Sequence, residues 1–201
     1  MDASLTSRRL LACVATLLSA ATAIVLASLP RAAQAATCPP PPDSVTPFLQ
    51  WQDSHDYVLT TGGSFELGAP AWSLSGGATI VSDRAPDPLA PSTDSRALSL
   101  PGGSTVTSAC VTAPKIVGVV RFFAKSVGTS GGQLKVEILV KGGVYQAGSI
   151  GAGGEWAPTP FLVSDAPAYK GAVTYQVRLT ATGAGAAFVV DDVYFDPFHS
   201  R

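Results

Sequence analysis

The sequence predicts an all-β fold, an antiparallel β-sandwich of the jelly-roll kind. Short strand-like runs recur between clusters of Gly, Pro and Asp, several of these runs alternate apolar and polar side chains, and no segment after the first 35 residues holds a helical period. About ten short strands without intervening helices favour two packed antiparallel sheets over strands that alternate with helices. A chain of 201 residues has room for one such domain.

Residues 1 to 35 have the features of an export signal. Arg8 and Arg9 precede an apolar run from Leu10 to Leu29, and Ala33 to Ala35 supply the small residues that a signal peptidase accepts. We therefore expect cleavage after position 35, a secreted, extracellular protein and no membrane contact after cleavage. An uncleaved anchor is the alternative, because the apolar run approaches the length that spans a bilayer. The arginine pair leaves both general and twin-arginine export open.

Two cysteines, Cys38 and Cys110, remain once the signal is removed. In an oxidising compartment such a pair forms one disulfide. Closing a loop of about 70 residues contributes roughly 4 kcal/mol in the chain-entropy model. A cysteine metal site is the weaker alternative, because two separated thiolates without a histidine partner do not complete a tetrahedral set.

A proline-rich arm and one packed domain follow the signal. Residues 36 to 47 form the arm, since Pro39 to Pro42 lack the N–H groups that a sheet interior needs. Residues 48 to 198 form the sandwich, with its longest loop from Ser82 to Ser95. Strands are expected at 56–60, 64–65, 72–74, 78–81, 96–100, 105–111, 116–124, 134–140, 144–150, 157–162, 173–180 and 186–195.

Alternation predicts which side chains of two long strands face solvent. In residues 134 to 140, Lys135 and Glu137 interrupt an apolar series, and residues 175 to 180 alternate in the same way. Because successive side chains of a strand point to opposite faces, the two charged residues are expected to face water.

Two short motifs bracket the domain. The first lies in residues 62 to 72 and the second in residues 188 to 195. Their characteristic residues are Gly63, Phe65, Glu66, Gly68 and Trp72, and then Asp191, Asp192 and Val193. These motifs resemble the opening and closing segments of carbohydrate-binding modules of the family 4/9/22 type, a galactose-binding-like jelly roll whose two ends lie side by side. Residues 38 to 198 also resemble a group of secreted actinobacterial proteins of unassigned activity, through an opening at Phe48 to Asp53 and an ending at Asp191 to Pro197.

The resemblance implies roles for the motif residues. Phe65 and Trp72 would be apolar anchors of the core, with Gly68 in the turn between them. In the related modules the glutamate and a carboxy-terminal aspartate hold a structural calcium ion, which takes hard oxygen ligands. Glu66 with Asp191 or Asp192 is therefore the expected calcium site. The alternative is that the glutamate caps a turn and the aspartates lie in solvent.

The resemblance also implies a non-catalytic protein that binds a glycan or a cell-wall polysaccharide. Such binding uses planar aromatic rings that stack on sugars and polar groups that reach hydroxyls. The candidate ligand-binding residues are Trp156, Tyr145, Tyr169, Arg121 and Gln146, with Trp51, Tyr57 and Glu137 as further candidates. Each aromatic could instead pack in the core or at its rim. A structural or adhesive extracellular protein is the alternative function.

Other functional classes have weaker support. The formal net charge of −1 and the absence of a Lys/Arg cluster argue against nucleic acid. Residues 128 to 132 have the letters of a nucleophile elbow, but they join two expected strands, whereas that turn leads from a strand into a helix. The downstream His199 lies close to the end of the sequence, so a secreted hydrolase is a distant alternative. We expect a monomer that is not an enzyme.

Overall fold

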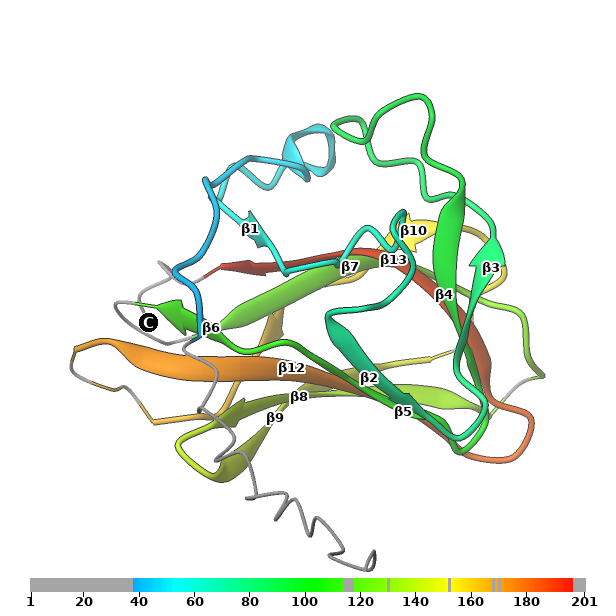
Figure 1. Cartoon of the computed structure of the whole chain (residues 1–201). Coiled ribbons are helices and arrows are strands. Elements are labelled where there is room, and N and C mark those ends of the chain that lie inside the picture. Colours follow the sequence, from blue (N-terminus) through cyan, green and yellow to red (C-terminus); the bar gives the residue numbers. More distant parts are fainter. Residues whose placement is uncertain are drawn as a thin grey trace, which may run out of the picture. The chain divides into compact units, whose positions relative to one another are not determined.

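The computed structural model describes residues 38–113, 118–129, 131–151, 153–167, 169 and 171–196, which fold into two antiparallel sheets (Figure 1). The expected signal at 1–35, its cleavage site and His199 lie outside these residues. Within the described part of the chain, no helix is long and apolar enough to cross a membrane.

Thirteen strands and one 3₁₀ turn, η1 (Leu49–Trp51), make up the described structure. The seven-stranded sheet has the order β10 (Ala157–Pro158), β7 (Val119–Ser126), β13 (Ala187–Asp196), β4 (Arg96–Pro101) and β3 (Thr79–Ser82), with β1 (Val58–Leu59) on β13 and β11 (Leu162–Val163) on β7. The six-stranded sheet has the order β2 (Trp72–Ser75), β5 (Thr105–Ser108), β12 (Val173–Thr182), β8 (Gln133–Val140) and β9 (Gly143–Ile150), with β6 (Val111–Ala113) on β12. The predicted all-β antiparallel sandwich is confirmed.

The main core lies between the two sheets and includes the expected anchors. Phe65 and Trp72 are buried with ring centroids 5.3 Å apart, as predicted. Across the sandwich, Tyr175 of β12 stacks on Phe195 of β13 at 3.9 Å. Burial of such side chains stabilises the fold by about 1.5–3 kcal/mol each, so the opening motif is fixed by packing.

A second, smaller core covers the outer face of the seven-stranded sheet. Phe48 and Tyr57 pack there against Phe123 of β7 and Tyr194 of β13. Figure 1 shows η1 and β1 on the side of β7 and β13 that faces away from β12. The segment that follows the arm therefore acts as a cover for one sheet.

The opening and closing motifs are hydrogen-bonded to each other, as their resemblance implied. The Thr60 N–H donates to the Val193 carbonyl at 2.9 Å, and the Val193 N–H donates to the Gly63 carbonyl at 3.1 Å. The strand expected at 64–65 was wrong. Phe65 has a φ of 58° within a series of turns, and the strand begins only at Trp72.

Two expected strands are each divided. The run 105–111 separates into β5 and β6 at Ala109 and Cys110, and the run 157–162 separates into β10 and β11. Pro158 and Pro160 lack N–H groups, so a continuous ladder through 157–162 cannot form.

The predicted disulfide between Cys38 and Cys110 is present, with the Cα atoms 5.2 Å apart. Beside it, the Thr112 N–H donates to the Pro39 carbonyl at 2.7 Å. The expected long loop is also present, since residues 83–95 connect β3 to β4.

Candidate functional site

The two sheets differ in how their outer faces are used. β7 and β13 are buried at almost every position, because the six-stranded sheet packs on one of their faces and the covering segment packs on the other. In β12 every second side chain is at least partly exposed, and the same holds for much of β9. No described segment crosses the outer face of the six-stranded sheet in Figure 1. We call this surface, formed by the outward side chains of β2, β5, β6, β12, β8 and β9, the open face.

A hollow of about 270 Å³ lies at one end of the open face, beside the β8–β9 hairpin. Outward side chains of neighbouring strands and the hairpin line it. They include Leu139, Val144, Thr174, Gln176, Lys141 and Cys110. The hollow therefore combines an apolar patch with hydrogen-bonding groups and one ammonium group, and Cys110 of the disulfide forms part of its wall.

An ion-pair cluster stands on the open face. The Glu137 carboxylate accepts from Arg178 Nε at 2.8 Å and pairs with Lys135 Nζ at 2.6 Å. Burial alone would raise the pKa of Glu137, but hydrogen bonds from Arg178 and Lys135 lower it overall. The predicted outward direction is correct, yet Glu137 is only 5% exposed because its two cationic partners cover it. Gln146 stands opposite it on β9 and is exposed.

Two tyrosines, Tyr145 and Tyr169, pack partly buried against the main core and do not line the hollow. The hydroxyl groups of Tyr145 and Tyr169 lie 3.2 Å apart, and Lys141 Nζ lies 4.7 Å from the Tyr169 ring centroid. The hydrogen bond with Tyr145 raises the pKa of Tyr169. Gly143 lines the hollow and lies against the Tyr145 ring, so close that an added Cβ would be 2.5 Å from a ring carbon. Among the described strand positions that point outward here, no residue is aromatic.

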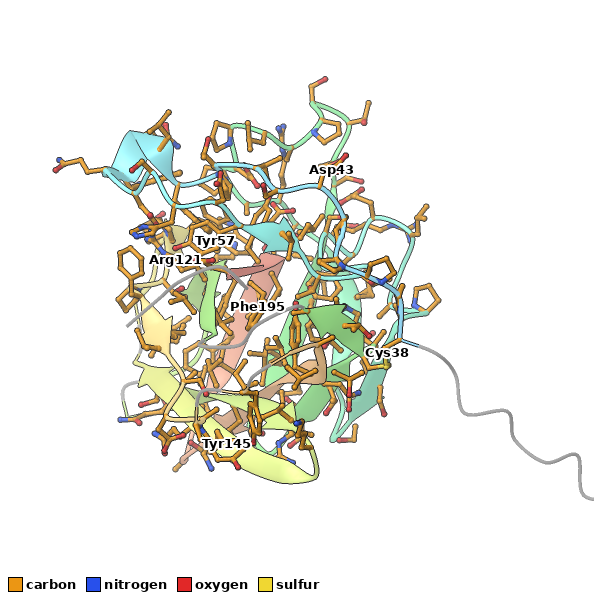
Figure 2. All side chains as sticks on the ribbon, turned by 90° about the vertical axis from the view of Figure 1, so that its left-hand side faces the viewer. Cys38, Asp43, Tyr57, Arg121, Tyr145 and Phe195 are labelled. Atoms are coloured by element: carbon orange, nitrogen blue, oxygen red, sulfur yellow. A yellow bond between two sulfur atoms is a disulfide. The ribbon has the colours of Figure 1, made fainter. Side chains whose placement is uncertain are left out.

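The five predicted ligand-binding residues do not form one site. Tyr145, Tyr169 and Gln146 are associated with the six-stranded sheet, whereas Arg121 and Trp156 lie on the outer side of the seven-stranded sheet. Figure 2 shows Tyr145 at the end of the domain opposite Arg121. Sequence spacing could not separate these groups, because the two sheets come together only in the folded chain.

Arg121 is buried and fully engaged. Its Nε donates to the Thr159 carbonyl at 2.9 Å, its Nη1 donates to Asp53, and its guanidinium carbon lies 4.3 Å from the Phe48 ring centroid. Tyr57 also donates to Asp53, at 2.7 Å. Burial would raise the pKa of Asp53, but hydrogen bonds from Tyr57, His55 and Arg121 lower it overall. This network, which the sequence reasoning missed, anchors the covering segment to β7.

Trp156 has polar partners of its own. Its Nε1 donates to Asp83 at 3.2 Å, and the Lys125 ammonium lies 5.2 Å from the indole centroid. Lys125 also forms an ion pair with Asp83 at 2.7 Å. The indole packs against the smaller core, so these contacts position it as part of the cover over the seven-stranded sheet.

A cluster of carboxylates lies under the 83–95 loop. Asp191 and Asp192 are 2% and 3% exposed, so the alternative that placed them in solvent is wrong. They occupy a register shift of β13, and the Ala85 N–H donates to Asp191 at 3.1 Å. Asp87 lies near them and accepts from the Tyr194 hydroxyl at 2.7 Å.

Burial is the main cause of altered protonation in this cluster. It raises the pKa of Asp191 to about 7 and that of Asp192 to about 8, with a further increase from neighbouring carboxylates. Glu66 accepts from the N–H groups of Ser95 and Arg96 at 2.9 and 2.7 Å, so it also holds the end of the loop.

The acidic cluster has the donor chemistry of a calcium site. Its members offer hard carboxylate oxygens, and no ion pair involves Glu66, Asp87, Asp191 or Asp192 among the described residues. In the same part of the chain, no three His, Cys, Asp or Glu side chains converge closely enough to hold a metal ion. The carboxylate oxygens of the cluster fit the ligand preference of calcium, and ligation would require these carboxylates to move closer to one another.

No protein-family model and no curated protein matches the sequence. Similar solved structures include TmCBM61 in complex with β-1,4-galactotriose, at 17% identity over 67% of this chain and 94% of that chain, with a TM-score of 0.44. Another is the CBM22-1 xylan-binding domain of Paenibacillus barcinonensis Xyn10C, at 15% identity over 69% and 94%, with a TM-score of 0.46. The arabinose-bound α-L-arabinofuranosidase MgGH51 matches at 19% identity over 69% and 26%, with a TM-score of 0.47.

Proposed function

We propose that this protein is a secreted, non-catalytic glycan-binding protein whose ligand lies on the open face. The observation that carries the proposal is the difference between the two outer faces. One is closed by a second core, while the other keeps a hollow of about 270 Å³ lined by Lys141, Thr174 and Gln176 together with apolar side chains. Sugars offer apolar ring faces and many hydroxyl groups, and a shallow mixed surface of this kind matches both.

Each part of the open face has a role in this proposal. Leu139 and Val144 supply apolar contact in the hollow, and Gln146 supplies an exposed amide next to the ion-pair cluster. Tyr145 and Tyr169 pack against the main core, so they are not assigned to the surface of the hollow. Glu137 orients Arg178 and Lys135 and takes no part in acid–base chemistry, because its oxygens are held by those cations.

The test is affinity for a panel of soluble polysaccharides, including xylan, galactan and β-glucan, measured by calorimetry and by affinity electrophoresis. Replacing both Gln146 and Val144 by Ala should reduce the affinity for the best ligand at least tenfold, because both side chains are exposed on the open face. Phe161→Ala is the matched control, because Phe161 is 43% exposed on the seven-stranded sheet. Retention on no polymer would overturn the proposal in favour of the structural or adhesive alternative.

We also propose a structural role for calcium at Glu66, Asp191 and Asp192, with Asp87 in reach. Two adjacent buried carboxyl groups with raised pKa values support it, because a divalent cation would stabilise their ionised form. Calcium would supply charge neutralisation and tie β13 to the 83–95 loop. Calorimetric titration of the EDTA-treated protein with CaCl₂ tests this, and an absence of binding heat at pH 8 would overturn it.

A further inference from the structure

The exposed charges of the open face are mostly positive. Lys135 and Arg178 have side chains that are 41% and 29% exposed, and Lys141 adds a third cation at the hollow. Glu137 is the one acidic side chain among the described outward strand positions of this face, and its side chain is only 6% exposed. Asp165 lies at the β9 edge, where its N–H donates to the Gln146 carbonyl at 3.0 Å. Three cations against two carboxylates leave a positive surface.

Arg178 keeps hydrogen-bond donors that Glu137 does not use. Arg178 reaches it through Nε, and no described group accepts from the two terminal amino groups of that guanidinium. A guanidinium presents its donors as a planar fork that matches a carboxylate in a bidentate geometry. Arg178 can therefore bind a second carboxylate while it keeps its bond to the first.

This positive surface contrasts with the rest of the protein. The whole chain has a formal net charge of −1. The acidic cluster of Asp87, Asp191 and Asp192 lies on the outer side of the other sheet, beneath the 83–95 loop. On that side of the protein the cations Arg121 and Lys125 are paired with Asp53 and Asp83, whereas Arg178 on the open face keeps donors that Glu137 does not use.

From this arrangement we infer that the open face selects acidic polysaccharides, in which uronic acid carboxylates recur along the polymer. The inference rests on the proposed function and names its ligand class. The described outward strand positions offer no aromatic ring for stacking, so charge-assisted hydrogen bonds from Arg178, Lys135 and Lys141 supply the affinity. Such contacts in a solvent-exposed site weaken as salt screens them.

The test compares two polymers with the same sugar backbone, polygalacturonate and its fully methyl-esterified form, in which each carboxylate is replaced by a neutral ester, using the full chain in calorimetric titrations. At 50 mM NaCl we expect the acidic polymer to bind at least tenfold more tightly, and at 500 mM NaCl the two affinities should converge. The double substitution Arg178→Gln and Lys141→Gln should remove the preference. Arg84→Gln, which changes an exposed arginine of the 83–95 loop, should leave it intact.

Each outcome decides the inference. Equal affinity for both polymers at low salt would overturn it and leave the proposed function standing. If Arg84→Gln reduces the preference for the acidic polymer as much as the double substitution does, the assignment to the open face is overturned, because binding would then follow the net charge of the protein. Binding to no polysaccharide, neutral or acidic, would overturn the proposed function itself. Thermal unfolding of each variant establishes that it is folded before its affinity is compared.

Discussion

The acidic cluster predicts an unusual dependence of stability on pH in the absence of calcium. The pKa values of Asp191 and Asp192 are raised to about 7 and about 8 in the folded protein, from the ordinary value of 3.8. At pH values between the unfolded pKa and the folded pKa of each group, the folded state binds more protons than the unfolded state. The free energy of unfolding therefore falls as the pH rises through this range. The slope is at most about 1.4 kcal/mol per pH unit for each group. The contribution of each group to the free energy of unfolding therefore falls by on the order of 3 kcal/mol between pH 5 and pH 7.

The assay is thermal unfolding in EDTA from pH 5 to pH 8, repeated with millimolar CaCl₂. The two groups together lose about 6 kcal/mol, so for a domain of this size we expect the melting temperature to fall by roughly 12–24 °C across that range in EDTA. Calcium should restore it at pH 8 and have little effect at pH 5, where protons compete for the carboxylates. The pKa values of the Asp53, Asp83 and Glu137 carboxyl groups are lowered, so these groups change protonation below pH 5 and do not contribute to the change between pH 5 and pH 8.

Matched variants separate the cluster from general effects of charge. Asp192→Asn should flatten the pH profile and reduce the calcium effect, whereas Asp43→Asn, at an exposed position of the arm, should change neither. A melting temperature that is level or rises between pH 5 and pH 8 in EDTA would refute the raised pKa values. Identical melting temperatures with and without calcium at pH 8 would show that calcium does not stabilise the folded protein.

Three further predictions concern the elements that hold the sandwich together. Reduction of the Cys38–Cys110 disulfide, whose residues are 72 apart, should lower the free energy of unfolding by about 4 kcal/mol in urea titrations, and an unchanged midpoint would show that the bridge contributes nothing. Arg121→Met should cost about 3–5 kcal/mol because it leaves Asp53 buried without its cation, and a loss below 1 kcal/mol would contradict that role. Gly63→Ala should lower the melting temperature by several degrees, because the new Cβ would lie 2.9 Å from a backbone oxygen of the closing motif; an unchanged melting temperature would mean that the motifs separate easily.

Local patterns predicted the parts of the fold that depend on local geometry. The alternation in β8 placed Lys135 and Glu137 on the outer face correctly, because side-chain direction in a strand follows from its period of two. The motif resemblance placed Phe65 and Trp72 in the core correctly. The strand-like run at 64–65 was wrong, because Phe65 has a positive φ within a series of turns, and the side-chain pattern does not reveal such a turn.

The long-range features could not be predicted. Arg121 is buried because the covering segment brings Asp53 to it across 68 positions of sequence, and an arginine on a strand otherwise looks exposed. Asp191 and Asp192 are buried because the 83–95 loop covers the irregular part of β13. The sequence offers one signal for the buried network, the aspartate Asp53 in the opening segment from Phe48 to Asp53.

The central claim is that the open face binds a glycan. Amide and side-chain NMR shifts of the isotopically labelled protein, recorded during titration with its tightest-binding polysaccharide fragment, test it most directly. We expect changes concentrated at the Gln146 side chain, Lys141, Val144 and the outward positions of β8 and β12, with the surroundings of Trp156 and Phe161 unaffected. Changes centred on Trp156 and the seven-stranded sheet instead would contradict it.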